Sequence, residues 1–249
     1  MRLSWRDGLA EVTIDRPPAN ALDSHAIAAL GDVLAEASAT GASGVLLTAA
    51  GDRFFSPGGD IKELQTLDLG QGLRRVDGFN RVLRHLAELP CPVAVAANGT
   101  AVGGGMELML AADYIVSVPS ALLGLPEINH GLLPSAVSVG NAVARLGARG
   151  ARDVLLSGRL FDAQEALRLG VVDSVAASPV QVRAEARAWL TEMAAKPPVL
   201  VAAMREALRA VPTLTQDERV EFSRVQFTSY FRDPGAVAAR ASLLSRWQR

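Results

Sequence analysis

Glu107 comes two residues after three consecutive glycines, and this stretch has residue types that could carry chemistry. An apolar run over 93–97 leads into Asn98–Gly105, and a helix-prone segment starts at Met106. Consecutive glycines let a ligand approach the backbone closely, and a helix N-terminus offers free N–H groups and the positive end of its dipole. The stretch therefore fits a site that stabilises negative charge beside a carboxylate. A tight turn from strand to helix, with Glu107 as a favourable first-turn acid, fits the same residues equally well.

A second pair of glycines, Gly58 and Gly59, also leads into a predicted helix. Asp60 suits the N-cap of that helix, and Glu63 stands three residues later, as in a capping box. Two backbone N–H groups, one from each glycine turn, can jointly hold a carbonyl oxygen as it becomes negative. This is the geometry of an oxyanion hole, in which each donor typically contributes ~3–4 kcal/mol in the transition state.

Glu127 is a second acid that could take part in such chemistry. Two carboxyl groups beside an enolate can act as acid and base when their environments separate their pKa values. As an ordinary loop acid after Pro126, however, Glu127 would need no such role. Spacing alone does not show that Glu127 meets Glu107.

Other kinds of site find less support in the sequence. The three histidines, His25, His85 and His130, are far apart, and none stands at a metal-ligand spacing from an acid or a cysteine, so we expect no metal site. The glycines miss the G-x-G-x-x-G spacing of dinucleotide binding, and no P-loop G-K-[ST] is present. Residues 136–140 loosely match the G-x-S-x-G nucleophile elbow, but no convincing strand precedes Ser138.

Composition and charge narrow the class of protein. Hydrophobic residues make up 49% of the 249 residues and the net charge is −1, so we expect a folded chain without a general field for nucleic acid or an anionic membrane. Cys91 is the only cysteine, which excludes an intrachain disulfide. Because the chain opens without a signal-peptide apolar region and has no apolar run of ~18 residues, we expect a cytoplasmic protein.

Hydrophobic spacing predicts an α/β body followed by helices alone. The predicted strands are 9–15, 45–48, 93–97, 114–118, 121–125 and 171–176. The predicted helices are one from Asp23 or Ser24 to about Gly41, one starting after Asp60, and 73–86, 106–112, 135–146, 151–156, 163–169, 182–195, 198–210, 217–231 and 234–249. Residues 65–72 are predicted to form a mobile loop. The chain therefore divides at about residue 178 into an α/β body, 1–178, and a helical region, 179–249.

Motifs along nearly the whole chain resemble, in order, those of the enoyl-CoA hydratase/isomerase (crotonase) superfamily. They are Asp-Arg-Pro-Pro-Ala-Asn-Ala-Leu over 15–22, Phe-Ser-Pro-Gly-Gly-Asp-Ile-Lys-Glu over 55–63, Asn-Gly over 98–99, Gly-Gly-Gly-Met-Glu-Leu over 103–108, Leu-Pro-Glu over 125–127, Gly-Leu-Leu-Pro over 131–134, and the stretches 157–159 and 163–173. As a set, these motifs are specific for the superfamily and less specific for the reaction within it.

The resemblance implies the α/β crotonase (ClpP-like) fold, a spiral of ββα units with a C-terminal helical region that assembles trimers and commonly hexamers. It implies an acyl-CoA thioester as substrate and no separate cofactor. The thioester carbonyl would lie between the N–H groups of Gly59 and Gly104. The positions that match those lining substrate and CoA in the family are Ala19, Gly59, Asp60, Ile61, Lys62 and Gly104.

In the hydratases of this superfamily both glutamates act. Carried over, Glu107 would activate the water that adds at Cβ of a trans-2-enoyl-CoA, and Glu127 would supply the proton to Cα. Other members often keep only one of these acids, so the presence of both favours an enoyl-CoA hydratase, which is a lyase. An isomerase or another acyl-CoA enolate enzyme is the first alternative, and a non-catalytic acyl-CoA-binding protein is the second.

One segment departs from the pattern of the superfamily. Hydratases typically continue after the second acid with Pro-Gly-Ala-Gly-Gly-Thr-Gln-Arg-Leu, whereas residues 134–141 read Pro-Ser-Ala-Val-Ser-Val-Gly-Asn. Ser135 stands where a glycine would approach the substrate. We therefore expect this wall of the pocket to differ, and with it the acyl preference or the reaction. His130, three residues after Glu127, could enter the same pocket, although a structural role also fits it.

Overall fold

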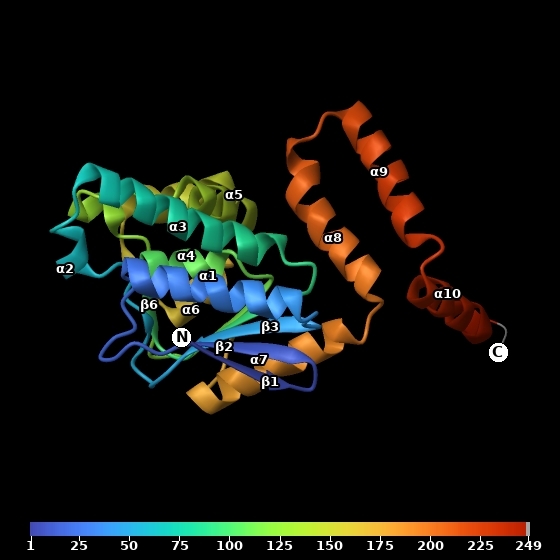
Figure 1. Cartoon of the computed structure of the whole chain (residues 1–249), viewed down its shortest axis with the longest axis horizontal. Coiled ribbons are helices and arrows are strands. Elements are labelled where there is room, and N and C mark those ends of the chain that lie inside the picture. Colours follow the sequence, from blue (N-terminus) through green and yellow to red (C-terminus); the bar gives the residue numbers. More distant parts are fainter. Residues whose placement is uncertain (248–249) are drawn as a thin grey trace.

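The computed structural model describes residues 1–247 and contains two sheets, surrounding helices and a C-terminal helical arm (Figure 1). The main sheet has the strand order β1 (Arg2–Arg6), β2 (Leu9–Ile14), β3 (Gly44–Ala49), β5 (Val93–Ala97), β7 (Tyr114–Ser117) and β10 (Ser174–Val175). The second sheet has the order β4 (Phe54–Ser56), β6 (Thr100–Val102), β8 (Leu122–Gly124) and β9 (Leu160–Asp162). The helices before the arm are α1 (Ser24–Ala39), α2 (Ile61–Leu64), α3 (Leu69–Glu88), α4 (Gly104–Leu110), the 3-10 helix η1 (Glu127–His130), α5 (Ala136–Ser157), α6 (Ala163–Leu169) and α7 (Pro179–Ala194).

The main sheet lies at the centre of the core. Its neighbouring strands run parallel, except that β1 pairs antiparallel with β2. Every residue of β3 and β5 is buried, because α7 covers one face of the sheet and α1, α3 and α4 lie on the other (Figure 1). Continuous apolar runs are typical of parallel strands that are covered on both faces. The strand predictions for β2, β3, β5 and β7 are confirmed, whereas β1, which is mostly exposed, gave no apolar signal and was not predicted.

The second sheet brings the two glycine stretches together. Strand β4 pairs in parallel with β6, and β6 pairs in parallel with β8. The carboxyl ends of parallel strands meet at the same edge of a sheet. Therefore the turn after β4, the turn after β6 and the start of η1 all emerge at one place.

Two helices differ from the prediction. Asp68 accepts a hydrogen bond from the N–H of Gln71, and the Gln71 side chain accepts one from the N–H of Asp68, so this capping box starts α3 at Leu69. The predicted loop over 65–72 is therefore wrong from residue 69 onward. The first turn of α3, Leu-Gly-Gln-Gly, has no apolar periodicity by which a helix could be recognised. The predicted helices 135–146 and 151–156 belong to one element, α5, which is interrupted at Gly147, where φ is 69° and ψ is 166°.

Residues 179–247 are mainly helical, as predicted. Helix α7 packs on β3, β5 and β7, whereas α8 (Pro198–Ala210), α9 (Gln216–Tyr230) and α10 (Pro234–Trp247) form an arm that extends away from the sheets (Figure 1). The last two residues of the predicted helix 234–249 lie outside the described residues. Helix α7 follows residue 178 and packs on the main sheet. The predicted domain boundary at residue 178 stays a prediction.

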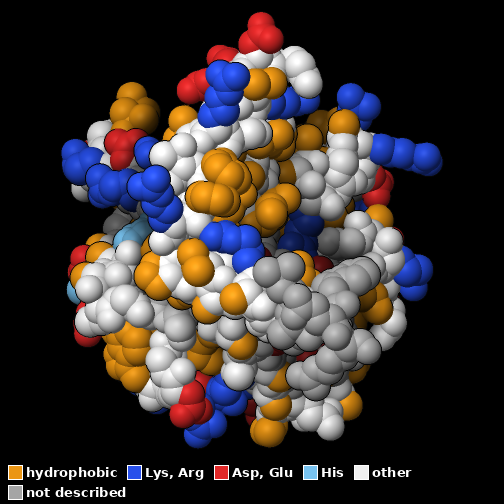
Figure 2. Space-filling model, turned by 90° about the vertical axis from the view of Figure 1, so that its right-hand side faces the viewer, with side chains coloured by type: hydrophobic (Ala, Val, Ile, Leu, Met, Phe, Trp, Pro, Cys, Tyr) orange, Lys and Arg blue, Asp and Glu red, His pale blue; other side chains and the backbone are white. Residues whose placement is uncertain are grey.

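The arm has much apolar surface that the rest of the described chain does not cover. Helices α8 and α9 contain no buried residue, and Met204, Leu208 and Val225 are each at least 60% exposed. Figure 2 shows apolar side chains between basic ones on the face of the molecule that carries the arm. Arg205 anchors α8 to the body through hydrogen bonds to Asp113 and to the carbonyl oxygen of Leu89.

Candidate active site

Glu107 lies in the first turn of α4 and is almost completely buried, with 5% of its surface exposed. Its Oε2 accepts a hydrogen bond of 2.8 Å from the backbone N–H of Ser135. Burial raises the pKa of the Glu107 carboxyl above its ordinary value, although the Ser138 hydroxyl, the Ser135 N–H and the positive charge of Arg75 act in the opposite direction. A carboxyl with a raised pKa exchanges protons closer to neutral pH, as a catalytic base requires.

Glu127 begins η1, and its carboxyl lies against the glycine turn, close enough to Glu107 for the two charges to interact. It is 8% exposed, and its Oε2 is buried without a hydrogen-bond partner among residues 1–247. Burial raises the pKa of Glu127, its own backbone N–H lowers it somewhat, and the negative charge of Glu107 adds to the rise, so that the pKa lies at about 7. The structure therefore brings together the two acids whose meeting the sequence spacing left open. A buried polar atom without a partner is typical of a functional site.

Two of the three glycines before Glu107, Gly103 and Gly105, are required by close contacts. Gly103 has a φ of 52° and a ψ of −126°, which favours glycine, and a methyl group there would lie 3.0 Å from Oε1 of Glu127. A methyl group at Gly105 would overlap the carbonyl oxygen of Ser56. The stretch is therefore a tight turn from strand to helix that lies against the Glu127 carboxyl, and its role in stabilising negative charge stays a prediction.

The second glycine turn lies directly against the first. Gly58 has a φ of 90°, and a methyl group there would lie 2.8 Å from the carbonyl oxygen of Val102 and 2.9 Å from the backbone nitrogen of Gly104. Within the described part of the chain, the N–H groups of Gly59 and Gly104 have no hydrogen-bond acceptor. Two unpaired donors on adjacent turns have the chemical character that an oxyanion hole requires.

A pocket of about 530 Å³ opens onto these donors. Gly59, Gly104 and Glu127 line it, whereas Glu107 lies deeper, behind the glycine turn. The other lining residues are mostly apolar or small: Pro57, Ile61, Leu64, Gln65, Val102, Gly103, Pro126, His130 and Leu132. The histidine is exposed at the rim. The pocket can accommodate an apolar group next to the Glu127 carboxyl and two N–H donors.

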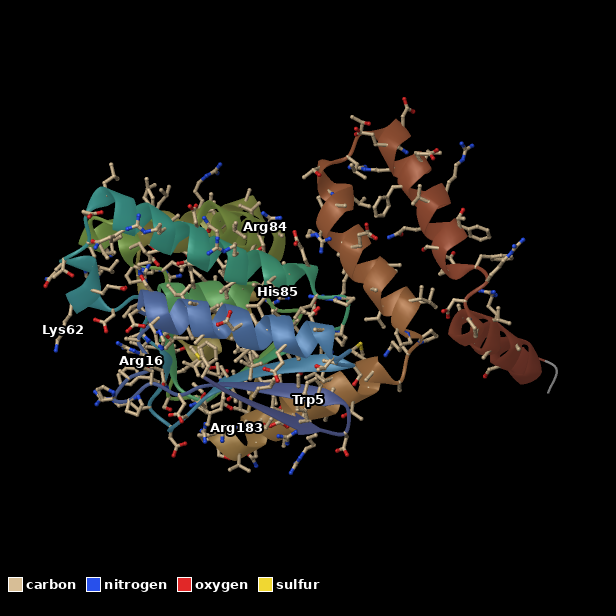
Figure 3. All side chains as sticks on the ribbon, viewed as in Figure 1. Trp5, Arg16, Lys62, Arg84, His85 and Arg183 are labelled. Carbon is tan, nitrogen blue, oxygen red and sulfur yellow. The ribbon has the colours of Figure 1, made fainter. Side chains whose placement is uncertain are left out.

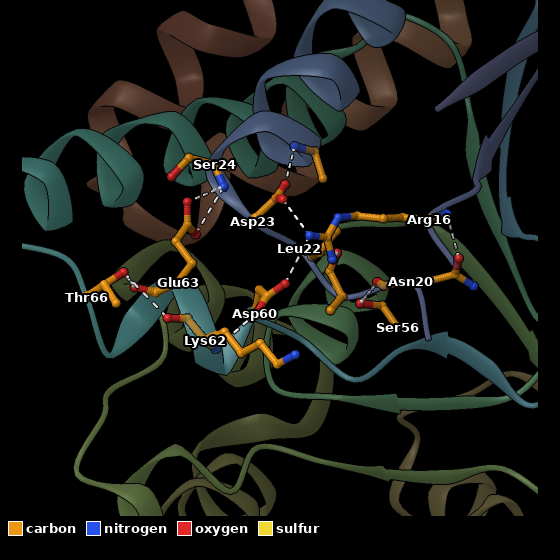
Figure 4. Close-up of polar contacts among 12 residues, drawn as sticks. Arg16, Asn20, Leu22, Asp23, Ser24, Ser56, Asp60, Lys62, Glu63 and Thr66 are labelled. Atoms are coloured by element: carbon orange, nitrogen blue, oxygen red, sulfur yellow. Dashed lines mark hydrogen bonds and ion pairs between the residues drawn. The ribbon is translucent and has the colours of Figure 1, made fainter. Parts of the chain in front are cut away.

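The loop that carries Gly59 is held by a network of charges (Figure 4). Arg16 donates from Nη2 to Oδ2 of Asp23 at 2.6 Å and to Oδ2 of Asp60 at 3.0 Å. Partial desolvation raises the pKa of Asp60, but hydrogen bonds from Arg16 and from the N–H groups of Lys62 and Glu63 outweigh it, so the pKa lies below its usual value. As predicted, Asp60 is the N-cap of α2, with its Oδ1 accepting from the Lys62 N–H at 3.0 Å.

The predicted capping box of α2 does not form. The carboxylate of Glu63 instead accepts from the backbone N–H of Ser24, at 2.9 and 3.1 Å, and from Nε of Arg75 at 3.2 Å. Glu63 therefore makes contacts with other chain segments in place of the local capping contact with Asp60. These contacts connect α2 to the start of α1 and to α3. Sequence spacing cannot reveal such a partner.

Of the predicted CoA-lining residues, Ile61 and Lys62 lie at the outer edge of this loop, whereas Gly59 and Gly104 line the pocket. Ile61 is 70% exposed and Lys62 points outward from the end of the molecule that carries α2 (Figure 3). Ala19 is half-buried in the bend between β2 and α1. Asn20 fixes that bend, because its side chain donates to the carbonyl oxygens of Ala50 and Phe54, each at 3.0 Å. The role of these positions in CoA binding stays a prediction.

Ser135, at the departure from the pattern of the superfamily, faces Glu107 with its backbone. Besides the N–H that holds Glu107, its hydroxyl accepts from the Val137 N–H at 3.0 Å as the N-cap of α5 and donates to Oδ1 of Asn80 on α3. The sequence analysis missed Asn80 and Arg75, because each looks like an ordinary polar position on an amphipathic helix. The N-cap role of Ser135 could have been read from its place before a helix.

The structure also bears on two other features, a metal site and a membrane-spanning helix. Between residues 1 and 247, no group of three or more His, Cys, Asp or Glu side chains could hold a metal ion. Nor does any described helix have the length and apolar character to cross a membrane.

Comparison with known proteins agrees with the fold. The family model for enoyl-CoA hydratase/isomerase matches residues 5–237. Carnitinyl-CoA dehydratases from Proteus mirabilis and Salmonella arizonae are each 35% identical to the chain, the first over 93% of this chain and 88% of its own length, the second over 90% and 85%. An enoyl-CoA hydratase structure from Bacillus anthracis has a TM-score of 0.91 at 24% identity and covers 98% of this chain and 96% of its own. DspI from Pseudomonas aeruginosa also has a TM-score of 0.91 at 24% identity, over 98% of this chain and 94% of its own.

The architecture, with two sheets and a pocket at the ends of the second sheet, is the crotonase fold that the sequence motifs predicted. The chain belongs to the enoyl-CoA hydratase/isomerase family.

Proposed function

We propose that the protein is an enoyl-CoA hydratase, a lyase that adds water to a trans-2-enoyl-CoA and catalyses the reverse dehydration. The observation that best supports this proposal is the pair of buried carboxyls, Glu107 and Glu127, beside the unpaired N–H groups of Gly59 and Gly104. Hydration needs one group to take a proton from water, one to give a proton to carbon, and donors for the negative charge that develops between these steps.

The two backbone donors would stabilise the enolate. As water attacks Cβ, negative charge moves to the thioester oxygen, and the Gly59 and Gly104 N–H groups would hold that oxygen. Such donors need no rearrangement as the charge develops, and removing one typically costs ~10²–10³ in kcat.

The two carboxyls would move the protons. Glu107 takes one proton from water while the water oxygen bonds to Cβ, and Glu127 gives its proton to Cα. Return of the proton from Glu107 to Glu127 completes the cycle. A pKa of about 7 leaves Glu127 partly protonated near neutral pH, as an acid requires. Because water addition neither oxidises nor reduces the substrate overall, we propose that no metal or redox cofactor is needed and that coenzyme A enters as part of the substrate.

Isomerisation of a 3-enoyl-CoA is the second candidate, because the same pair of acids could move a proton between Cα and Cγ. The nearness of Glu127 to the glycine donors favours this chemistry as much as hydration. Hydration differs in requiring a base for water, and the deeper Glu107, whose Oε2 is oriented by the Ser135 N–H, supplies one.

The pocket lining favours an uncharged acyl group. A carnitinyl group, which the names of two relatives indicate as their substrate, carries a quaternary ammonium that aromatic faces bind well. The lining of this pocket consists instead of aliphatic and small residues with Gln65, Glu127 and His130. We therefore propose that the protein acts on simple 2-enoyl-CoA thioesters in preference to carnitinyl-CoA.

The uncovered apolar surface of the arm supports a homotrimer or a hexamer built from two trimers. Exposed apolar side chains over α8 and α9 would be buried by the arms of other copies. We further propose a cytoplasmic location, with no nucleic-acid or membrane partner. Light scattering should give a mass of three or six chains, and a monomer at micromolar concentration would contradict this assembly.

The catalytic proposal is tested with Glu107→Gln and Glu127→Gln against crotonyl-CoA, 3-enoyl-CoA, carnitinyl-CoA and longer 2-enoyl-CoA substrates. Each substitution should lower hydration of crotonyl-CoA by about 10²–10⁴-fold while the circular dichroism spectrum is unchanged. Glu192→Gln, in an exposed side chain of α7, is the matched control. Unchanged turnover in either active-site variant refutes the role of that residue. Reaction of the 3-enoyl substrate alone would indicate an isomerase, and tight binding without turnover would indicate an acyl-CoA-binding protein.

A further inference from the structure

Arg75 of α3 lies directly behind the glycine turn that carries Gly59. Its side chain is 13% exposed, its Nη2 donates to the carbonyl oxygen of Leu22 at 2.8 Å, and its Nε donates to Oε2 of Glu63 at 3.2 Å. A methyl group at Gly59 would lie 2.9 Å from Nη2 of Arg75. The guanidinium therefore contacts the backbone that presents one of the two proposed oxyanion donors.

We propose that Arg75 is a positioning residue of this active site, which holds the Gly59 N–H in place through Leu22 and directs positive charge toward the thioester oxygen. This inference rests on the proposed function. It concerns a residue that does not itself touch the substrate.

The first part of the inference follows from the backbone contacts. Leu22 and Gly59 form an isolated parallel bridge, in which the Leu22 N–H donates to the carbonyl oxygen of Gly58 at 2.8 Å and the Asp60 N–H donates to the carbonyl oxygen of Leu22 at 3.2 Å. Arg75 donates to that same carbonyl oxygen of Leu22. Loss of the guanidinium would thus loosen the bridge at the residue pair that fixes the direction of the Gly59 N–H.

The second part follows from the orientation of the charges. Glu63 pairs with the Nε edge of Arg75 and is itself held by the Ser24 N–H, as Figure 4 shows for Glu63 and Ser24. The Nη2 edge faces Gly59 instead. The ion pair is therefore a fixed dipole whose positive end points at the glycine turn, and in a partly buried site such a dipole acts more strongly than in water.

The surroundings identify Arg75 as the cation that acts on the site. Glu127, Ser135 and Ser138 surround the Glu107 carboxyl, and the positive charge that lowers the pKa of Glu107 is that of Arg75. Lys62 and His130 are exposed, at the outer edge and at the rim of the pocket. On its other side Arg75 faces a groove of about 620 Å³ whose further charged or titratable residues are Asp32, Glu63, Arg74, Arg81 and His85. The Glu107 carboxyl and a developing enolate thus share the charge of Arg75, which is partly buried.

The test compares Arg75→Gln and Arg75→Lys with Arg74→Gln, which removes an exposed arginine from the neighbouring position of the same helix. We expect Arg75→Gln to lower kcat about 10–100-fold and to change KM by less than about threefold, because the effect falls on the transition state. Since the Glu107 pKa rises without the positive charge, the acidic limb of the kcat/KM profile should move to higher pH. The lysine variant keeps the charge and should return that limb toward its wild-type position. The control should resemble the wild type in all three measurements.

A measurement without turnover separates this inference from the proposed function. Titration of the ¹³C-labelled Glu107 carboxyl by NMR, assigned with Glu107→Gln, should show a higher pKa in Arg75→Gln and a value nearer the wild type in Arg75→Lys. An unchanged pKa and an unchanged kcat in Arg75→Gln would overturn the inference. If Arg75→Gln does not fold, Glu63→Gln removes the negative end of the ion pair and should lower the pKa of Glu107, and no change there would also contradict it. A wild type that hydrates no enoyl-CoA overturns the proposed function, while the NMR titration still decides on Arg75.

Discussion

Replacement of Glu127 by glutamine should stabilise the fold at alkaline pH while it removes activity. Glu127 is 8% exposed, and burial together with the charge of Glu107 raises its pKa from 4.5 to about 7. The native state therefore resists ionisation of this carboxyl. Glutamine keeps the shape of the side chain and carries no charge at any pH.

The size of the effect follows from the difference between the two pKa values. Between pH 4.5 and about 7 the native state holds a proton that the unfolded state has released, so the free energy of unfolding falls as pH rises through this window. The difference of about 2.5 in pKa corresponds to about 3 kcal/mol when the window is crossed completely. Between pH 5 and pH 8, about 2–3 kcal/mol of that penalty develops in the wild type.

Urea unfolding of wild type and Glu127→Gln at both pH values, at one fixed protein concentration, measures this penalty. The stability of the variant relative to the wild type should increase by about 2–3 kcal/mol from pH 5 to pH 8. Glu192→Gln, in a side chain that is 72% exposed, should show no such increase. A stability difference between Glu127→Gln and wild type that is the same at both pH values would refute the argument that Glu127 is buried at a raised pKa.

Three further predictions concern the same site. For hydration, kcat/KM should fall above a pH of about 7, because Glu127 must be protonated to act as the acid, and a profile flat to pH 9 would contradict that role. Gly103→Ala should lower stability by about 1–3 kcal/mol and reduce kcat, because its φ of 52° disfavours alanine and the methyl group would press on Glu127, which thermal unfolding and steady-state kinetics can check. Asn80→Ala should reduce kcat about tenfold by freeing the Ser135 hydroxyl and loosening the Ser135–Glu107 contact, and a double-mutant cycle with Ser135→Ala should show non-additive losses. If the losses of kcat in the two single variants add up fully in the double variant, Asn80 does not act through the Ser135–Glu107 contact.

The sequence predicted the buried elements better than the exposed ones. Strands β3 and β5 are continuous apolar runs that can only be buried, and the α1 start is marked by Asp23, which caps it as expected. Strand β1 is mostly exposed, so its pairing with β2 left no apolar pattern to recognise. The break of α5 at Gly147 and the early start of α3 depend on local geometry and capping, which periodicity does not record.

The residue types of the site were predictable, but its contacts were not. Motif resemblance pointed to Glu107, Glu127, Gly59 and Gly104, and the structure brings their backbone turns and carboxyls together, while their catalytic roles stay a prediction. The turns and carboxyls come together because the short strands of the second sheet pair in parallel. The spacing of residues along the sequence does not show this pairing. Arg75 was not predicted for a similar reason, since its partners, Leu22 and Glu63, belong to two other segments of the chain.

The product formed from a trans-2-enoyl-CoA in D₂O distinguishes hydration from migration of the double bond. We expect 3-hydroxyacyl-CoA with one deuterium at C2, delivered by Glu127, and a hydroxyl at C3 from the water activated by Glu107. Product NMR should show both changes for the wild type and neither at a comparable rate for Glu107→Gln or Glu127→Gln. Deuterium incorporation with migration of the double bond and no hydroxyl at C3 would contradict the proposed hydration.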